Sequence, residues 1–463
     1  MSIPFTLDGQ PLQALEGETI FKAAQRHGVD IAHLCFKDGY RPDGNCRACV
    51  VEVKGERTLA PSCCRSVTPG MEVQASSPRA RKSQQMVVEM LLSDMPDQGY
   101  KWNGGDATRP HGELSDWAAQ MDVQVRPELR ALRRVQPVAD VSHPAMAVNL
   151  DACIQCNRCV RACREEQVND VIGYALRGAD SKIVFDLDAP MAESSCVACG
   201  ECVQACPTGA LSAKTLIGSQ QVDRTVDSVC PFCGVGCQLT YQVKDETIVG
   251  VEGRDGPANH SRLCVKGRFG FDYAHHPQRL TVPLIRKPGV PKDPAQAPQP
   301  GDWSSVFREA TWDEALALAA GGLRGLRDTH GPKALAGFGS AKGSNEEAYL
   351  LAARLEGVGS GAVSNPVADV AQAGLILVIG SNPTANHPVA ATWMKNAAKA
   401  GAKIVLADPR VTDIGKHAWR TLQFKADTDV AMLNALIHTV IDEGLVDEEL
   451  VRTRASNFEA LRD

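Results

Sequence analysis

The C-terminal part of this 463-residue chain contains no cysteine, because all 17 cysteines lie at or before Cys264. Thiolate ligands for metals are therefore excluded after Cys264. The chain also lacks a run of 18 apolar residues, so the sequence predicts no transmembrane helix. Its first residues lack a basic stretch followed by an apolar one, and no twin arginine stands near them, so we expect a cytoplasmic location. The small net charge of −6 gives no reason to expect nucleic-acid binding.

The cysteines before this point are clustered at short spacings. In a long chain whose thiols stay reduced, repeated C-x2-C spacings indicate metal binding rather than disulfides. The length allows about three domains. We therefore predict a multidomain chain of α+β and α/β parts, with metal sites in the front half and a different kind of fold behind them.

Residues 1–80 are predicted to form a small β-rich domain. Asp8-Gly9 is a strong hairpin signal between two short apolar stretches. Gly28 follows a helical pattern and is placed to end that helix. The predicted elements are strands over Pro4–Leu7 and Pro11–Ala14, a helix over Thr19–His27 and a strand over Val50–Val53.

Four cysteines of this domain follow the spacing C-x10-C-x2-C-x13-C: Cys35, Cys46, Cys49 and Cys63. Glycines between the first two would let the backbone wrap tightly around inorganic sulfide. We predict an iron–sulfur cluster on these four residues. The alternative is a structural zinc site, although zinc sites usually pair two C-x2-C halves. The remaining Cys64 is interpreted as a buried structural cysteine.

Residues 81–142 contain no cysteine and are predicted to be a helical linker. Helical spacing of apolar residues predicts helices over Gln84–Leu92 and Pro127–Arg134. His111 lies in the polar stretch between them, and we interpret it as a surface histidine rather than a ligand.

Residues 143–222 carry the pattern C-x2-C-x2-C-x3-C twice, which is the two-cluster ferredoxin pattern. Three thiolates from one tight loop take three corners of a cube, and a distant residue closes the fourth. Because the fourth cysteine crosses to the other cluster in this pattern, we predict two [4Fe–4S] ligand sets: Cys153, Cys156, Cys159 and Cys206, and Cys196, Cys199, Cys202 and Cys163. Arg158, Arg161 and Arg164 are interpreted as solvated side chains or partners of acids such as Glu165 and Glu166.

Residues 223–285 contain four further cysteines spaced C-x2-C-x3-C-x26-C: Cys230, Cys233, Cys237 and Cys264. This set predicts a third [4Fe–4S] cluster. Alternating residues predict a small β-rich domain, with strands over Gln238–Val243 and Thr247–Val251 and a turn at Lys244–Glu246.

Residues 286–463 begin with a proline-rich connector over 286–310 and continue as an α/β pattern. A strand, a helix and a second strand in this order form a βαβ unit, which builds a parallel sheet. The loops after such strands are where open α/β sheets bind nucleotides. The predicted helices cover Trp312–Arg327, Asn345–Leu355, the stretch from the Ser381–Pro388 turn to about Lys399, and Asp427–Leu445. The predicted strands cover Ala334–Gly339, Leu375–Gly380 (buried) and Lys403–Asp408.

The segment Pro42–Cys49 resembles the β-grasp [2Fe–2S] ferredoxins, in the version found at the N-terminus of the large iron–sulfur subunit of respiratory complex I. Relatives of that type carry a cluster held by one His and three Cys in the region of the predicted linker. His111 has no cysteines beside it, so we predict no cluster there.

Residues 223–285 resemble the molybdenum or tungsten bis-pterin guanine dinucleotide oxidoreductases. In that family the lysine two residues after the last cluster ligand lies between cube and pterin, which implies an electron-relay role for Lys266; the alternative is a surface lysine. The resemblance also implies that loops of a partial parallel α/β domain line the dinucleotide. The implied cofactor-binding residues are Gly380, Ser381, Asn382 and His387, with Asp408 and Arg410 at the guanine end.

The order of the domains resembles the alpha, catalytic subunit of cytosolic NAD-dependent molybdenum formate dehydrogenases. Runs at Asn45–Cys49, Ala152–Cys159 and Gly339–Lys342 carry the likeness. The resemblance implies oxidation of formate to CO2 at a molybdenum bis-pterin guanine dinucleotide. It implies one [2Fe–2S] and three [4Fe–4S] clusters that carry the electrons, and as partners a flavin- and NAD-binding subunit and a small [2Fe–2S] subunit.

Two departures separate this sequence from that family. The family ligates its metal with a Cys or selenocysteine followed by His, shortly after the helix that we expect from Asn345; here no Cys-His pair occurs anywhere. The family also continues beyond the position of Asp463, so we expect an incomplete α/β domain. Three hypotheses remain: a formate dehydrogenase alpha subunit, a non-catalytic electron-transfer subunit, and an iron–sulfur subunit of the complex I or hydrogenase type.

Overall fold

The computed structural model describes residues 2–96, 112–135, 138–217, 222–293, 302–337, 340, 343, 346, 365–454 and 457–462. The chain divides into two compact units, Met1–Ser364 and Asn365–Asp463. Within these ranges, no helix combines the length and the apolar character needed to cross a membrane.

The N-terminal sheet has the strand order β2-β1-β5-β3-β4. Strand β1 (Ser2–Leu7) pairs antiparallel with β2 (Gln10–Leu15) and parallel with the central strand β5 (Met71–Gln74). The hairpin predicted at Asp8-Gly9 is confirmed, because both residues adopt positive φ in the turn. The other elements are α1 (Ile20–Arg26), whose N-cap is Thr19, β3 (Val50–Val53) and β4 (Ala60–Pro61).

The segment predicted to be a linker is packed into a core. Its helices are α2 (Pro78–Ser93), α3 (Glu113–Gln120) and α4 (Pro127–Arg130). Val88 and Leu114 from the first two pack with Leu34 of the N-terminal domain and Ala210 of the ferredoxin-like region. The apolar face of α2 therefore joins two domains, whereas a linker would leave it exposed. Helix α3 was not predicted, α4 stops four residues before the predicted end at Arg134, and His111 lies outside the described residues.

The ferredoxin-like region is built from two similar halves. One β-ribbon pairs β6 (Met146–Val148) with β9 (Leu211–Ala213), and the other pairs β7 (Ile172–Ala175) with β8 (Lys182–Phe185). Each cysteine run leads into a short helix, α5 (Arg158–Arg161) or α6 (Glu201–Ala205). A π-helical turn over Ala162–Glu166 follows α5 and carries Cys163; such turns are often found at functional sites.

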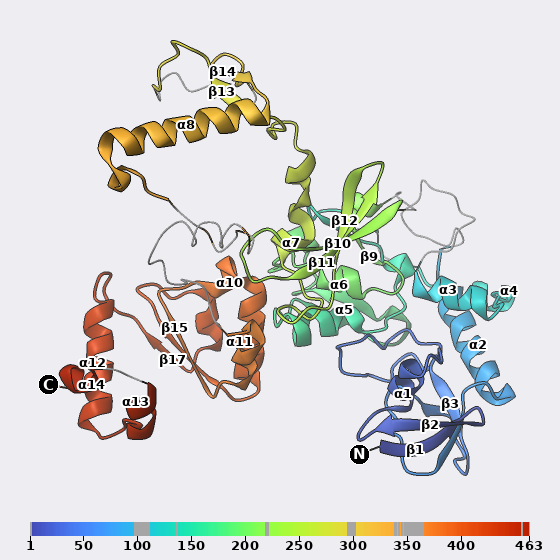
Figure 1. Ribbon diagram of the computed structural model, residues 1–463. Helices are drawn as coiled ribbons and strands as arrows, with labels where there is room; N and C mark the ends of the chain where they lie inside the picture. Colours follow the sequence, from blue (N-terminus) through green and yellow to red (C-terminus); the bar gives the residue numbers. More distant parts are fainter. Residues whose placement is uncertain are drawn as a thin grey trace. The chain divides into compact units, whose positions relative to one another are not determined.

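The next region is a three-stranded antiparallel sheet, β10-β11-β12, which Figure 1 shows beside helix α7. The predicted hairpin is confirmed: β11 (Gln238–Lys244) and β12 (Thr247–Gly253) meet at a turn in which Asp245 and Glu246 have positive φ. Strand β10 was not predicted. The remaining elements of this unit are β10 (Arg224–Val229), α7 (Val265–Phe269), β13 (Leu284–Arg286), β14 (Phe307–Glu309) and α8 (Trp312–His330).

The strand predicted over Ala334–Gly339 is wrong in the part that is described. Pro332–Ala334 forms a 3-10 turn, and the three residues after it belong to no strand. A strand needs a neighbour to satisfy its backbone N–H and C=O groups, and no described strand pairs with this segment. The helix predicted over Asn345–Leu355 lies outside the described residues, apart from the single residue Glu346.

The second unit contains the predicted parallel βαβ arrangement. Strands β15 (Leu375–Ile379), β16 (Lys403–Ala407) and β17 (Arg420–Leu422) pair in parallel, and α11 (Pro388–Lys399) connects the first two. Strand β15 is buried on one face only, because Leu375 and Leu377 are exposed; successive side chains of a strand point to opposite faces. The remaining helices are α10 (Pro383–Asn386), α12 (Asp429–Asp442), α13 (Glu448–Arg454) and α14 (Phe458–Arg462).

Replacing Leu114 by Ala should weaken the packing between the N-terminal domain and the ferredoxin-like region. Leu114 is fully buried, and removing a buried leucine side chain costs about 2–5 kcal/mol. Chemical denaturation followed by circular dichroism should show an earlier first transition. The control is Leu132→Ala, since Leu132 is 74% exposed; equal effects of the two variants would contradict the packing of α3.

Candidate metal centres

The four cysteines predicted to hold the [2Fe–2S] cluster lie together at the edge of the N-terminal core. Cys35, Cys49 and Cys63 are buried, Cys46 is half-buried, and the Cys35 backbone N–H donates to the Cys46 sulfur at 3.4 Å. Mutual hydrogen bonds among the thiols lower the pKa of Cys35 and that of Cys49. They raise the pKa of Cys46 and Cys63. The thiols are therefore in contact with one another, as a shared ligand set requires.

The prediction that Cys64 is a buried structural cysteine is wrong. Cys64 is exposed, and its sulfur lies 3.6 Å from that of Cys63. It also lies against Gly44: a Cβ at that glycine would stand 2.9 Å from the Cys64 sulfur. Cys63 fills the buried position, so the next residue in the chain remains at the surface.

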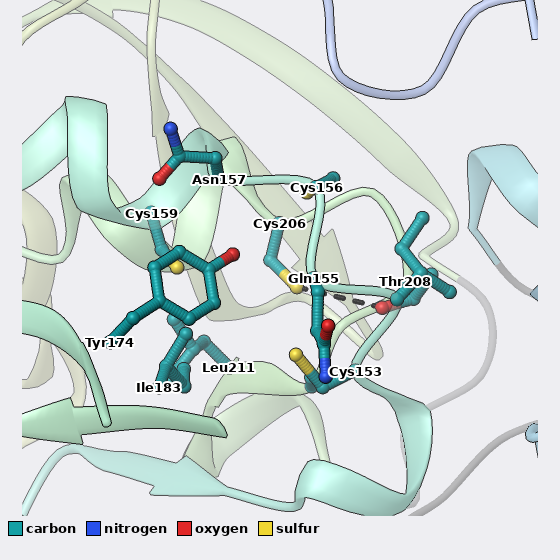
Figure 2. Close-up of a pocket in the computed structure, with 12 residues that line it drawn as sticks. Cys153, Gln155, Cys156, Asn157, Cys159, Tyr174, Ile183, Cys206, Thr208 and Leu211 are labelled. Carbon is teal, nitrogen blue, oxygen red and sulfur yellow. Dashed lines mark hydrogen bonds between the residues drawn. The ribbon is translucent and has the colours of Figure 1, made fainter. Parts of the chain in front are cut away.

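The first run of the ferredoxin-like region surrounds a cavity together with the last cysteine of the second run. Cys153, Cys156, Cys159 and Cys206 line this cavity, and Figure 2 shows Cys206 among the residues of the first run. Apolar walls come from Ile183 and Leu211. Burial raises the pKa of Cys153 to about 11 and that of Cys156 to about 12. The donor set fits a cluster closed by a crossover residue, since thiolates are the ligands that iron–sulfur clusters use.

The second run is brought together with Cys163. Burial raises the pKa of Cys199 to about 12, and Cys163 and Cys196 are near enough to raise it further. The backbone N–H of Val171 donates to the Cys163 sulfur at 3.3 Å, and that of Ala198 donates to the Cys196 sulfur at 3.4 Å. Such N–H groups stabilise thiolate charge.

The third set, Cys230, Cys233, Cys237 and Cys264, lies where β11 and α7 begin. The Cys230 N–H donates to the Cys237 carbonyl at 2.8 Å, which closes the first loop. Burial raises the pKa of Cys237, and Cys230, Cys233 and Cys264 raise it further. Burial also raises the pKa of Cys230, while the charge of Lys266 opposes this rise. Lys266 itself is exposed, so the structure leaves both its relay role and the surface alternative as predictions.

Within the described ranges, no three His, Cys, Asp or Glu side chains converge on a point where a single metal ion could bind. Thiolates on the corners of a cluster stand farther apart than the four ligands of one zinc ion, which all lie about 2.3 Å from the metal. The ligand roles of the 16 cysteines remain predictions.

The interpretation of the arginines in the first run is wrong for Arg161 and holds only in part for Arg158, which pairs with an acid but is not solvated. Arg158 and Arg161 are 2% and 1% exposed, not solvated. Arg158 forms a two-pronged pair with Glu113 at 2.6 and 2.7 Å, and Arg161 donates to the carbonyls of Cys35 and Arg41. Their partners lie in other domains, where the local sequence could not indicate them.

Arg164 agrees with the interpretation made from the sequence, and the two acids do form ion pairs with arginines. Arg164 is exposed and pairs with Asp170 at 2.5 Å. Glu165 pairs with Arg41 at 3.0 Å, and Glu166 accepts from Arg262 at 2.6 Å. Both acids therefore reach residues of other domains.

The [2Fe–2S] loop is docked on the first cysteine run. Asn45 donates to the Gln155 carbonyl at 2.8 Å, and Asn157 donates to the Asp43 carboxylate at 2.7 Å. The Cys264 loop is docked instead on the chain that follows Cys163, since Gln167 donates to the Leu263 carbonyl at 3.1 Å. The ferredoxin-like region thus contacts a cysteine-bearing loop of each of the two other domains.

The pterin loops predicted from the resemblance lie in the second unit, at the carboxyl ends of β15 and β16. Asp408 is buried and accepts from the Arg410 N–H at 2.8 Å, while the Arg410 side chain is exposed. Gly380 has a φ of +56° and its N–H donates to the Ala407 carbonyl at 3.0 Å, so the two loops start side by side. Ser381 and Asn382 are half-buried, and His387 is exposed between α10 and α11. Adjacent carboxyl ends of parallel strands are the usual nucleotide-binding edge; binding by these residues remains a prediction.

Sequence reasoning missed a buried carboxylate and its two partners: Glu201, Arg268 and Tyr40. Arg268 and Glu201 form an ion pair at 3.1 Å and are 3% and 2% exposed. The Tyr40 hydroxyl donates to the other oxygen of Glu201 at 3.0 Å. The sequence did offer one signal, because Glu201 is a charged residue two positions from the predicted ligand Cys199. Its partners come from other domains, so the local sequence could not indicate them.

Comparison with protein-family models assigns four regions of the chain. Residues 1–78 match the 2Fe-2S iron-sulfur cluster binding domain, and residues 152–210 match the 4Fe-4S dicluster domain. Residues 223–276 match the molybdopterin oxidoreductase Fe4S4 domain, and residues 279–452 match molybdopterin oxidoreductase. The chain combines molybdopterin oxidoreductase regions with 2Fe-2S and 4Fe-4S domains. This agrees with the cofactor classes expected from the cysteine patterns, while the cluster count and the guanine dinucleotide remain predictions.

Two curated relatives match almost the whole chain. A Bacillus subtilis (strain 168) protein named "Putative formate dehydrogenase YrhE" is 28% identical over 100% of this chain and 52% of its own length. "Probable oxidoreductase YjgC" of the same strain is also 28% identical, over 97% of this chain and 50% of its own length. The chain therefore spans about half the length of the curated relatives it matches.

Two solved structures match about half of this chain each. An NAD+-reducing [NiFe]-hydrogenase in the H2-reduced state matches 48% of this chain and 92% of that chain, with 25% identity and a TM-score of 0.42. Acetylene hydratase from Pelobacter acetylenicus matches 51% of this chain and 34% of that chain, with 20% identity and a TM-score of 0.37.

The iron content of single-cysteine variants tests the ligand sets. One [2Fe–2S] and three [4Fe–4S] clusters amount to about 14 iron atoms per chain. Cys156→Ser should lose about four of them, because Cys156 lines the first ferredoxin-like cavity. Cys64→Ser is the matched control, as Cys64 is exposed and outside every predicted set. An iron content of about two in the wild-type chain, or an equal loss in both variants, would contradict the assignment.

Proposed function

We propose that this chain belongs to an NAD-linked formate dehydrogenase, as the part of its alpha subunit that carries electrons away from a molybdopterin centre. The partners would be a flavin- and NAD-binding subunit and a small [2Fe–2S] subunit. When bound, the clusters would supply one-electron carriers between the oxidation of formate and the flavin. The names of the relatives support formate as the substrate.

One observation carries the electron-transfer part of this proposal: three cysteine-bearing domains are docked by their ligand loops. Gln167 of the ferredoxin-like region donates to the Leu263 carbonyl beside Cys264, and Arg161 donates to the carbonyl of Cys35, a predicted [2Fe–2S] ligand. The ferredoxin-like region therefore contacts the ligand loops of both other cysteine-bearing domains, and electrons would pass between them through it. A partner would then accept electrons at the [2Fe–2S] end, where the loop residues Asp38 and Gly39 are exposed.

The pterin part of the proposal has weaker support from this chain. The two adjacent loops at Gly380 and Asp408 would hold the dinucleotide through backbone N–H groups and a carboxylate. The molybdenum would need a further ligand, and the sequence offers neither a Cys-His pair nor any cysteine after Cys264.

This lack of a thiolate ligand favours a second candidate, an electron-transfer subunit without catalysis. Such a subunit would use the same three docked domains and would receive electrons from another protein or from a reduced flavin partner. Its α/β part would then be structural.

Metal analysis combined with a formate assay separates the two candidates. For a formate dehydrogenase, we expect molybdenum or tungsten in addition to iron, together with formate-dependent reduction of a dye. Iron alone and no dye reduction would rule out formate oxidation by this polypeptide. Reduction of its iron by NADH through an added flavin subunit would then support the electron-transfer candidate.

A further inference from the structure

Glu201 is a buried carboxylate that lies between two predicted cluster ligands. It opens helix α6, two residues after Cys199 and next to Cys202, and it is 2% exposed. A carboxylate removed from water is unfavourable unless charged or polar partners compensate it. The partners of Glu201 therefore show which groups compensate its buried charge.

Each oxygen of this carboxylate is held by a different domain. Oε2 pairs with the guanidinium of Arg268, which stands four residues after Cys264, at 3.1 Å. Oε1 accepts from the hydroxyl of Tyr40, in the loop that leads from Cys35 to the other [2Fe–2S] ligands, at 3.0 Å. Burial, and then the charge of Glu201, raise the pKa of Tyr40, so its hydroxyl stays protonated and able to donate. Segments adjoining three predicted cluster sites meet at this one side chain.

Arg268 is fixed as firmly as its partner. It is 3% exposed, and it donates to the Cys199 and Val251 carbonyls, each at 3.3 Å, and to the Gln204 side chain. Its stem passes Gly200 so closely that a Cβ there would lie 2.8 Å from the Arg268 Cγ. The guanidinium thus holds a permanent positive charge against the loop of the second ferredoxin-like set.

We propose that Glu201 and Arg268 form a charge pair that sets the reduction potential of the cluster predicted on Cys163, Cys196, Cys199 and Cys202. This inference rests on the proposed electron-transfer function. A nearby negative charge disfavours the addition of an electron, a positive charge favours it, and both effects are strong in a poorly solvated interior. The opposite charges of Glu201 and Arg268 nearly cancel at the cluster, so loss of either side chain leaves the charge of the other uncompensated. Glu201 and Arg268 are positioning residues in this role, since they act on the cluster rather than on a substrate.

The test is a redox titration of the full chain with its clusters, followed by electron paramagnetic resonance. Glu201→Gln leaves the Arg268 charge uncompensated, so the midpoint potential of one [4Fe–4S] cluster should shift to more positive values. Arg268→Met leaves the Glu201 charge, so the same cluster should shift to more negative values. The matched control is Glu193→Gln, which makes the same change at an exposed carboxylate of the same domain and should not shift the potential.

Opposite shifts in the same cluster are the signature of a charge effect, since simple loosening of the structure would move both variants in one direction. Shifts of equal sign, or shifts no larger than that of Glu193→Gln, would overturn the proposal. If the single variants lose iron, the double variant Glu201→Gln with Arg268→Met decides. It removes both charges, and such replacements of buried pairs are often tolerated, so it should keep its iron and a near-wild-type potential. Loss of iron from the double variant as well would reduce the pair to a structural role.

The titration uses dithionite as the reductant and does not depend on formate. A wild-type chain that shows its clusters but no formate oxidation would therefore count against the proposed function alone. A wild-type chain with four clusters and variants that titrate like the control would count against the charge pair alone.

Discussion

Buried guanidinium groups must be paired, and this requirement holds the cysteine-bearing domains together. Arg158, Arg161 and Arg268 are all nearly inaccessible to water, and each finds its partners in another part of the chain. Breaking a buried pair by removing one member typically costs about 3–5 kcal/mol, because the remaining charge is left uncompensated. The domains therefore cannot separate without exposing or stranding these charges, which gives the predicted clusters fixed neighbours.

The composition of the candidate sites could be predicted because their determinants are local. A run such as Cys153 to Cys163 is one tight loop and a helix, so its spacing is visible in the sequence. The meeting of Cys206 with the first run was also predictable, because the repeat of the pattern implies the crossover. The cavity that Cys206 shares with the first run has the composition expected from that pattern.

The partners of the charged residues could not be predicted, since they depend on how domains meet. Arg158 pairs with a glutamate 45 positions away, and Arg161 reaches a carbonyl 126 positions away. The same limit explains the failures in the fold. Turns with special backbone angles, such as Asp8-Gly9, were found from local chemistry. The packing of α2 and the missing strand after Ala334 depend on neighbours that no local pattern contains.

Close approach between these domains also explains why glycine stands at their contacts. Gly200 has a φ of +69°, and a Cβ there would press on Arg268 and on the ring of Phe269 at 2.9 Å. Gly112 has a φ of +91°, and a Cβ there would stand 2.7 Å from the Pro207 carbonyl oxygen, beside Cys206. Any side chain at either position would require both a strained backbone and a wider gap. The absence of a side chain at these glycines lets the domains approach closely enough for the arginine pairs to form. The same close approach keeps the predicted cluster sites near one another, which favours electron transfer because its rate falls steeply with distance.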